Sequence, residues 1–582
     1  MMHDKIPGAD ANAVRPARND RDREFHAAIG RYTGGLSPAA LGTATLDWWM
    51  HLLGSPNKQT ELYNLAWDQA METLKLPAAC LAGKEDCPEM AAMQKDRRFA
   101  APGWRKFPFN VMARGFLKQE AWWNEATSKV HGTDPRHERI VNFAIRQIVD
   151  TCSPSNYFWT NPAVLEKTRE ERGQNIMRGF QNYFEDLKDQ TTGEKELDPD
   201  YKVGEVLGIT PGEVVLRNDL IELIRYTPST AEVRPEPVLI VPAWIMKYYI
   251  LDLEQRNSMV KYLVDQGFEV YMISWKNPGK EDAEKGMDDY VRNGSLAALD
   301  FVSQGTRKVH AAGYCLGGTL LSATAAHVAH RAFQPVASMT LMAAQVDFTE
   351  AGELSLFISE SQVSFLEDIM KTQGYLDAEQ MAGAFTMLRS NDLFWSRIIT
   401  QYMMGQKSGK NALMAWNADS TRMPARMHTE YLRGLFLENQ LARGQWRVLG
   451  HTVNLTDLDM PIFAVGTETD HVAPWRSVYK INLLTDTDVT FALTSGGHNA
   501  GIVSEPGHPR RHYRLLDKPQ GAPHLSADSW LNNAEMRDGS WWEAWSAWLG
   551  ARSGAPVPAP SAPGRRPRRA SPAARRSWKP RI

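Results

Sequence analysis

One short motif combines a nucleophile with a backbone that could expose it. Gly313-Tyr314-Cys315-Leu316-Gly317 stands between the apolar strand pattern KVHAA and a helical pattern. A strand that turns directly into a helix strains the central residue and requires small flanking residues. This nucleophile elbow would present the Cys315 thiol at a helix N-terminus, where the helix dipole favours a thiolate. The alternative is a small buried cysteine in a glycine-rich turn.

Two later residues have the chain order that a catalytic triad requires. Enzymes with such an elbow present the nucleophile first, then an acid, then a histidine. Asp470 follows the strand pattern MPIFAVG, and His498 follows the strand pattern VTFAL. In that arrangement His498 would accept the Cys315 proton and Asp470 would orient the imidazole. Taken singly, the acid fits a solvated turn and the histidine an ordinary loop, and Glu468 and His471 are the nearest rivals.

The expected chemistry is acyl transfer from a thioester. The oxyanion would need two backbone N–H donors, for which we expect Leu316, after the nucleophile, and Ala243, in the loop after PVLIV. A cysteine suits a thioester substrate, because its attack exchanges one thioester for another. The acyl group then stays activated for a later acceptor.

The order of apolar segments predicts the fold that would position these residues. PVLIVPAW, FEVYMISW, KVHAAGY, ASMTLMAA and MPIFAVG are typical of buried parallel strands, and helical patterns separate them. We predict an α/β-hydrolase fold over residues 201–550, a mostly parallel sheet with helices on both faces. The strand pattern lapses over residues 347–444, which predicts an inserted cap that covers Cys315 and is mobile.

The two ends of the chain differ from this middle part. LDWWMHLLG, ELYNLAWDQAMETL, GFLKQEAWWNEA and IVNFAIRQIVD have helical spacing and predict a mainly helical domain over residues 21–200. Residues 1–20 are expected to be disordered. Residues 551–582 form a Pro/Ala/Arg-rich basic segment that is also expected to be disordered.

Composition and charge exclude several classes. With 43% hydrophobic and 10% aromatic residues, the chain is neither disordered overall nor collagen-like. The overall charge is −2, and residues 551–582 carry nine basic residues and no acid, so the first 550 residues carry −11. A body of that sign is a poor nucleic-acid binder. Four cysteines without a CxxC pair predict neither a disulfide framework nor a metal site, and the polar N-terminus predicts a cytoplasmic protein.

Several further motifs resemble those of polyhydroxyalkanoate synthases, and the resemblance extends over roughly residues 90–550. Besides the elbow, the motifs are Asp96-Arg97-Arg98-Phe99, Ser153-Pro154-Ser155-Asn156, Lys247-Tyr248-Tyr249-Ile250-Leu251-Asp252, Trp416-Asn417-Ala418-Asp419, Tyr431-Leu432-Arg433, Asp470-His471, Ser495-Gly496-Gly497-His498 and Gly539-Ser540-Trp541-Trp542. The chain length fits the single-subunit class I, with class II as the alternative.

This resemblance implies polymerisation of 3-hydroxyacyl-CoA, expected to be 3-hydroxybutyryl-CoA, into a polyester with release of CoA. It also implies the triad Cys315, Asp470 and His498, in which the aspartate helps activate the incoming hydroxyl through the histidine. The CoA thioester would be the substrate, with no further cofactor and no metal. A homodimer at polyhydroxyalkanoate granules, with phasins as partners, would follow. The alternatives are a cysteine-elbow hydrolase (a polyester depolymerase or a dienelactone-hydrolase-like esterase) and a non-catalytic granule protein.

Other residues complete the predicted site or depart from the family pattern. The candidates for the substrate pocket are Trp244, Tyr248, Asp252, Trp416 and Tyr431. Met246 stands where the family usually has Asn, and Asn499 follows the histidine where Ile is common. The tryptophans of DGSWWEAWSAWLG are expected in the core or in an oligomer contact rather than against substrate. The basic tail is interpreted as a solvated extension, with weak contact to granules, phasins or nucleic acid as the alternative.

Overall fold

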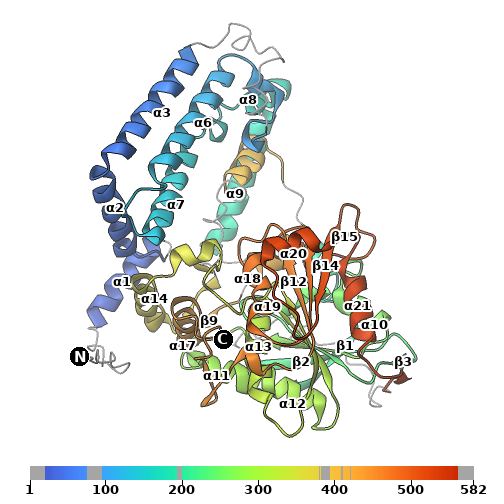
Figure 1. Ribbon diagram of the computed structural model, residues 1–582. Helices are drawn as coiled ribbons and strands as arrows, with labels where there is room; N and C mark the ends of the chain where they lie inside the picture. Colours follow the sequence, from blue (N-terminus) through green and yellow to red (C-terminus); the bar gives the residue numbers. More distant parts are fainter. Residues whose placement is uncertain are drawn as a thin grey trace, which may run out of the picture.

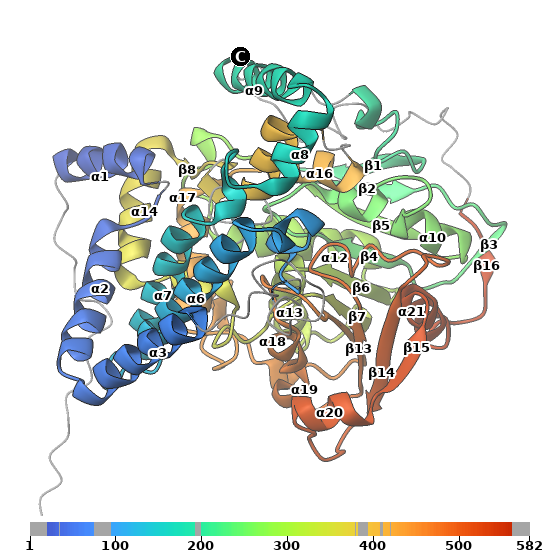
Figure 2. The same cartoon turned by 90° about the horizontal axis from the view of Figure 1, so that it is seen from above.

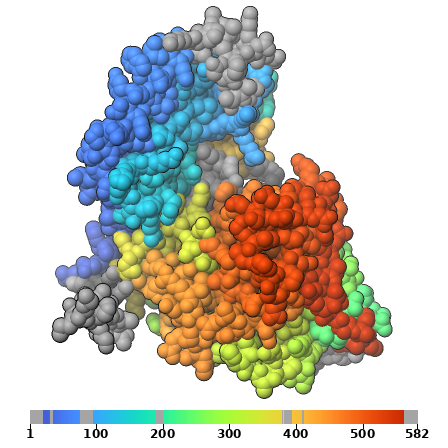
Figure 3. All heavy atoms as spheres, viewed as in Figure 1, coloured from blue at the N-terminus to red at the C-terminus, as the bar shows by residue number. Residues whose placement is uncertain are grey.

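The computed structural model describes the chain from residue 20 to residue 560 with a few interruptions. The described residues are 20–33, 35–74, 93, 95–192, 199–378, 380–381, 394–407, 411–419 and 421–560. The N-terminal helices form a lobe that stands above a sheet-containing lobe (Figure 1). In the space-filling view, yellow residues from the middle of the chain lie between these two lobes (Figure 3).

The N-terminal region is helical, as the apolar spacing predicts. Its helices are α1 (Asp20–Tyr32), α2 (Pro38–Leu53), α3 (Pro56–Leu74), α6 (Phe109–Ala126), α7 (Pro135–Thr151), α8 (Pro162–Glu170) and α9 (Gln174–Thr192). Helix α7 begins where Asp134 Oδ1 accepts the N–H groups of Arg136 and His137. Proline at the first position of α7 needs no N–H partner, so the start of the helix is well defined.

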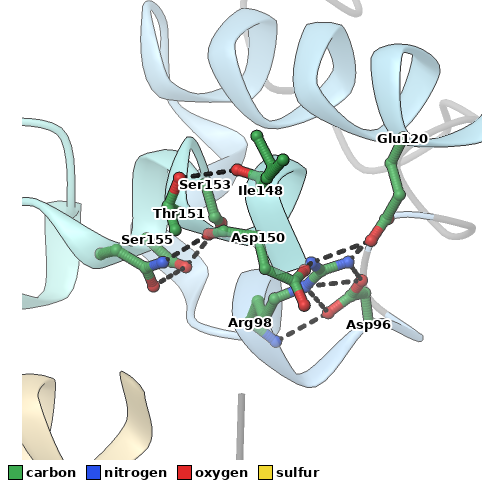
Figure 4. Close-up of polar contacts among 9 residues, drawn as sticks. Asp96, Arg98, Glu120, Ile148, Asp150, Thr151, Ser153 and Ser155 are labelled. Carbon is green, nitrogen blue, oxygen red and sulfur yellow. Dashed lines mark hydrogen bonds and ion pairs between the residues drawn. The ribbon is translucent and has the colours of Figure 1, made fainter. Parts of the chain in front are cut away.

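One guanidinium connects three segments of this lobe (Figure 4). Arg98, in the short helix η1 (Arg97–Phe99), is 2.7 Å from Asp96 and 2.8 Å from Glu120 of α6. It also lies 3.2 Å from Asp150 of α7. Burial alone would lower the pKa of Arg98, but its hydrogen bonds to Asp96 and Glu120 raise it above the ordinary value. We refer to Asp96, Arg98, Glu120 and Asp150 as the Arg98 cluster.

The second lobe is built on a large sheet. Among the described residues it has ten strands, in the order β1-β2-β5-β4-β6-β7-β12-β13-β14-β15. The strands are β1 (Gly212–Arg217), β2 (Ile221–Tyr226), β4 (Val238–Val241), β5 (Val270–Trp275), β6 (Val309–Tyr314), β7 (Val336–Met342), β12 (Ile462–Thr467), β13 (Val489–Thr494), β14 (His512–Lys518) and β15 (Glu535–Asp538). Figure 2 shows most of these strands side by side across the lobe.

The direction of the strands changes at the two edges of the sheet. From β5 through β4, β6, β7 and β12 to β13 all neighbours are parallel. The pairs β1–β2, β2–β5, β13–β14 and β14–β15 are antiparallel. The mostly parallel centre confirms the predicted α/β-hydrolase fold. Strands β14 and β15 do not appear in the apolar pattern of the sequence, because β14 is only partly buried and β15 is exposed along its whole length.

Helices cover the sheet, as expected for buried parallel strands. They are α10 (Met259–Asp265), α11 (Met287–Asp289), α12 (Ala297–Ser303), α13 (Leu316–Val328), α18 (Trp475–Tyr479), α19 (Ile481–Leu484), α20 (Ala527–Asn533) and α21 (Trp541–Gly550). Strands β5, β6, β12 and β13 are buried at every position. Their apolar residues therefore form one core between the helical layers.

The region between β7 and β12 contains the segment predicted as an inserted cap. Its elements are η8 (Glu353–Phe357), α14 (Glu360–Gln373), β8 (Tyr375–Leu376), η10 (Ile398–Met403), α16 (Ala412–Ala418), β9 (Met423–Pro424), α17 (Ala425–Tyr431), η11 (Leu432–Leu437), β10 (Arg447–Val448) and β11 (His451–Thr452). Helix α1 packs on α14, and α9 packs on η10 (Figure 1). The insertion thus joins the two lobes. Within the described ranges, no helix has the length and apolarity needed to cross a membrane.

The boundary of the C-terminal tail needs a correction. The sequence analysis begins the tail at residue 551, but the fold continues to residue 560. Strand β16 (Val557–Pro558) pairs with β3 (Glu232–Val233), and the Ser553 hydroxyl lies 3.0 Å from Nε2 of the buried His310. The proline-rich segment up to residue 560 is therefore held against the second lobe by the pairing of β16 with β3 and by the contact of Ser553 with His310. Residues 1–19 and 561–582 lie outside the described residues.

Candidate active site

The strand-to-helix turn at Cys315 has the strained geometry of a nucleophile elbow. Strand β6 ends at Tyr314, α13 begins at Leu316, and Cys315 between them has φ 52° and ψ −127°. A Cβ on Gly317 would lie 2.0 Å from the carbonyl oxygen of Val241, at the end of β4. The turn can therefore approach β4 only with glycine at this position. A non-glycine residue held at positive φ is typical of a functional site.

The sheet brings Asp470 and His498 together. Strands β12 and β13 are neighbours, and each candidate lies in the loop after the C-terminal end of its strand. His498 Nδ1 is 2.7 Å from Asp470 Oδ2. The Asp470 carboxylate is fully buried and also accepts the N–H groups of Val472 and Ala473, both at 2.8 Å. These bonds fix the carboxylate and leave Nε2 of the histidine for proton exchange.

The electrostatics of this pair connect it to Cys315. Burial alone would lower the pKa of His498, but Cys315 and Asp470 raise it well above the usual value. Burial alone would raise the pKa of Asp470, but His498 and the N–H groups that it accepts lower it. The opposite shifts favour an imidazolium beside a carboxylate.

Two groups of neighbours hold the His498 loop in place. The Tyr314 ring stacks on the His498 ring with a centroid distance of 5.7 Å, and its hydroxyl donates to the Asn499 side chain. In α21, Trp541 Nε1 donates to the Gly501 carbonyl at 3.0 Å, and the next tryptophan binds the following carbonyl at 2.9 Å. The tryptophans therefore lie in the core, as one of the two expectations states. The apolar pattern of α21 does not indicate that its tryptophans bind the histidine loop.

Cys315 opens onto a cavity of about 120 Å³ between the sheet and the insertion. Its lining is mostly apolar and includes Ile245, Phe357 and Phe436. The N-terminal region also contributes, since Leu36, directly before α2, belongs to the lining. No local pattern in the sequence indicates that Leu36 lies near Cys315, because this proximity arises from tertiary packing.

The five predicted pocket residues separate into two groups. Tyr431 lines the cavity, and burial together with Cys315 raises the pKa of its hydroxyl well above the usual value. The other four residues lie outside this lining, and their contact with substrate stays a prediction. They are Trp244, Tyr248, Asp252 and Trp416.

Those four side chains pack the loop after β4 instead of contacting the cavity. Trp416 Nε1 donates to the Lys247 carbonyl at 2.8 Å. Asp252 accepts the Ser258 hydroxyl at 2.7 Å, and Trp244 packs edge-on against the Tyr431 ring at 5.9 Å. Tyr248 is buried against its neighbouring tyrosine. Their aromatic and polar character serves the fold of this loop.

The remaining candidates differ in their position relative to Cys315. Leu316 lines the cavity, whereas from the loop after β4 the lining residue is Ile245, two positions beyond Ala243. The oxyanion hole formed by Leu316 and Ala243 stays a prediction. The rival acid Glu468 is 3.2 Å from His512, so it is engaged away from the histidine of the site.

The sequence is similar to one family of polymerases over most of its length. Residues 95–263 match the family described as "Poly-beta-hydroxybutyrate polymerase (PhaC) N-terminus", residues 16–58 match "Poly-beta-hydroxybutyrate polymerase N terminal", and residues 236–504 match "alpha/beta hydrolase fold". A "Poly(3-hydroxyalkanoate) polymerase" of Methylorubrum extorquens is 40% identical over 80% of this chain and 77% of its own. A "Poly(3-hydroxyalkanoate) polymerase subunit PhaC" of Rhizobium meliloti is 37% identical over 87% of this chain and 82% of its own, and that of Cupriavidus necator is 33% identical over 80% of each.

Proposed function

The chain belongs to the family of poly(3-hydroxyalkanoate) polymerases, and from that premise we propose that it polymerises 3-hydroxyacyl-CoA through an acyl group bound to Cys315. It is an enzyme of polyester synthesis on an α/β-hydrolase fold. We take 3-hydroxybutyryl-CoA as the monomer. The observation that carries the proposal is the strained Cys315, which faces a mostly apolar cavity beside the bonded pair of His498 and Asp470.

The first step loads one acyl group. His498 holds the proton of the Cys315 thiol, and the sulfur attacks the carbonyl carbon of the CoA thioester. The bond between that carbon and the CoA sulfur breaks, and His498 returns the proton to the leaving CoA thiolate. We propose that the N–H groups of Leu316 and Ala243 stabilise the oxyanion.

The second step transfers that acyl group to a hydroxyl. His498, oriented by Asp470, takes the proton from the 3-hydroxyl of an incoming 3-hydroxyacyl group. The resulting oxygen then attacks the thioester carbonyl on Cys315. The new ester bond lengthens the chain by one unit, and the sulfur is released with the proton. Water would compete with the hydroxyl, so a mostly apolar cavity beside Cys315 supports polymerisation over hydrolysis.

The substrate and the growing product also need room to enter and leave the Cys315 cavity. Leu36 and residues of the insertion form part of its wall, so we propose that movement of the insertion admits the thioester. Because the product is an insoluble polyester, we further propose that the enzyme acts at polymer granules, as a homodimer with phasins nearby.

The test follows free CoA and bound acyl groups together. With 3-hydroxybutyryl-CoA, the wild type should release CoA continuously, form polymer and carry labelled acyl groups on Cys315. Cys315→Ala should lower CoA release at least about 10³-fold and carry no label, because the nucleophile is gone. Cys315→Ser should be nearly as slow, since a hydroxyl is a much weaker nucleophile at neutral pH. Release of free 3-hydroxybutyrate without polymer would instead identify a hydrolase.

A further inference from the structure

The Cys315 cavity contains a histidine to which the proposed mechanism gives no task. His428 lies in α17, one turn before Tyr431, and lines the same cavity as Cys315. The residue is only 3% exposed, and its Nδ1 atom is buried without a hydrogen-bond partner in the described part of the chain. An unpaired buried polar atom destabilises a fold, so its presence at a cavity wall points to a ligand that completes it.

Other polar side chains of the lining are engaged within the protein. Thr319 Oγ1 donates to the Gln345 carbonyl at 2.7 Å. Gln362 donates to the Gly35 carbonyl at 2.6 Å and accepts the Ser37 N–H at 2.7 Å. His428 differs from them, because its buried Nδ1 has no hydrogen-bond partner within the described ranges. The imidazole is therefore available to a molecule in the cavity.

The chemistry of this imidazole fits a neutral hydroxyl. Burial lowers the pKa of His428 to about 3, so the ring is neutral near pH 7 and offers one donor and one acceptor. A hydroxyl likewise donates and accepts. An anion would need a positively charged partner, which a neutral imidazole cannot supply.

The position of His428 relative to the sulfur fits the acyl group of the proposed reaction. The Tyr431 ring lies 5.9 Å from the His428 ring, and Cys315 is near enough to Tyr431 to influence its hydroxyl. His428 and Cys315 are thus both neighbours of Tyr431 in the lining of one cavity. A short acyl chain on Cys315 has hydrocarbon for the apolar wall and one hydroxyl, on its third carbon.

We propose that His428 binds the 3-hydroxyl of the acyl group on Cys315 and thereby selects 3-hydroxyacyl over unsubstituted acyl groups. This inference rests on the proposed function. His428 acts here as a specificity residue, because it contacts the substrate without taking part in bond making or proton transfer.

The experiment compares first-turnover loading of Cys315 by 3-hydroxybutyryl-CoA and by butyryl-CoA in the full-length protein. The wild type should load the hydroxylated substrate about 3- to 10-fold faster, the range expected for one neutral hydrogen bond. His428→Phe and His428→Leu should bring the two rates together, since neither side chain can bind a hydroxyl. His428→Asn should keep part of the preference, because a carboxamide both donates and accepts. Phe436→Leu, in the same wall, should change both rates by a similar factor.

Each outcome decides the matter. A wild type without preference for the hydroxylated substrate overturns the role of His428, whether or not any variant folds. The same holds if His428→Phe or His428→Leu keeps the wild-type ratio while still loading. If the wild type labels Cys315 with neither substrate, the proposed function fails, and the role of His428 fails with it. Loading with an unchanged ratio leaves the proposed function intact and removes only this inference.

Discussion

The Arg98 cluster and the Cys315 site both gather ionisable side chains from separate parts of the chain, and they differ in what remains unpaired. In the cluster, each nitrogen of the guanidinium group meets a carboxylate oxygen of Asp96, Glu120 or Asp150 (Figure 4). All nitrogens of the guanidinium are thus paired, and no reactive atom is left. At the other site, Asp470 and His498 satisfy each other, while the sulfur of Cys315 faces a cavity.

This difference separates structural from chemical use of charged residues. Removing the cation of a closed ion cluster is destabilising, because it leaves a buried carboxylate, here Asp150, without its cation. An open site keeps one atom available and strained, as the positive φ of Cys315 shows. Perturbed pKa values occur in both places, so they do not identify a site by themselves. A site is identified instead by an available nucleophile at a cavity.

Among the variants that test this comparison, Asp470→Asn should have the largest effect, which is on the rate of chain elongation. We expect chain elongation to fall about 10³-fold, because the imidazole loses the carboxylate that fixes its tautomer and stabilises its charge. Loading of Cys315 should fall less, about 10-fold, since a thiol gives up its proton more readily than a hydroxyl. Single-turnover trapping of labelled acyl groups, measured beside steady-state CoA release, separates the two steps.

The control for that prediction is His498→Ala, which should block loading itself. Equal losses of loading and turnover in Asp470→Asn would contradict this division of roles between the aspartate and the histidine. The triad could persist in that case, but Asp470 would then serve both steps alike.

The sequence allowed much of the open site to be located, and little of what surrounds it. Cys315, Asp470 and His498 could be found because each follows a strongly apolar strand, and parallel strands end at the same edge of a sheet. His428 and Leu36 could not be found in this way. His428 reaches the cavity through the packing of an irregular insertion, and Leu36 through the packing of the N-terminal lobe. The predicted fold was right in its centre for the same reason. It was incomplete at the edge strands, where the apolar pattern is weak.

An intermediate effect, on the free energy of unfolding, should come from a change in the Arg98 cluster. Arg98→Met should lower the free energy of unfolding by about 3 kcal/mol, because Glu120 and the buried Asp150 lose their cation. CoA release per folded molecule should stay the same, since the cluster lies apart from the cavity lining. Denaturant unfolding measured beside initial rates of the folded fraction tests both statements.

The neighbouring residue supplies a matched control. Arg97 is exposed, so Arg97→Met should change the free energy of unfolding by no more than about 0.5 kcal/mol. If Arg98→Met and Arg97→Met are equally stable, the Arg98 cluster is not a stabilising unit. If Arg98→Met slows turnover of the folded fraction, the separation between a structural and a chemical cluster is wrong.

The smallest expected effect is a difference between the Arg98 cluster and the Cys315 site in how their contributions to stability change with pH. The pKa of His498 is raised above 6.5 in the folded protein, so its charge contributes stability that is fully present below about pH 6.5 and is lost as the pH rises through the folded pKa. Arg98 stays charged over the same range, because its pKa is raised from an already high value.

We therefore compare the free energy of unfolding of the wild type with that of His498→Gln and of Arg98→Met, from about pH 6 to about pH 9. The advantage over His498→Gln, about 1–2 kcal/mol at the lower pH, should shrink as the pH rises, whereas the advantage over Arg98→Met should stay constant. A constant advantage over His498→Gln would mean that the folded and unfolded proteins bind equal numbers of protons over this range, which contradicts the predicted difference between the two sites.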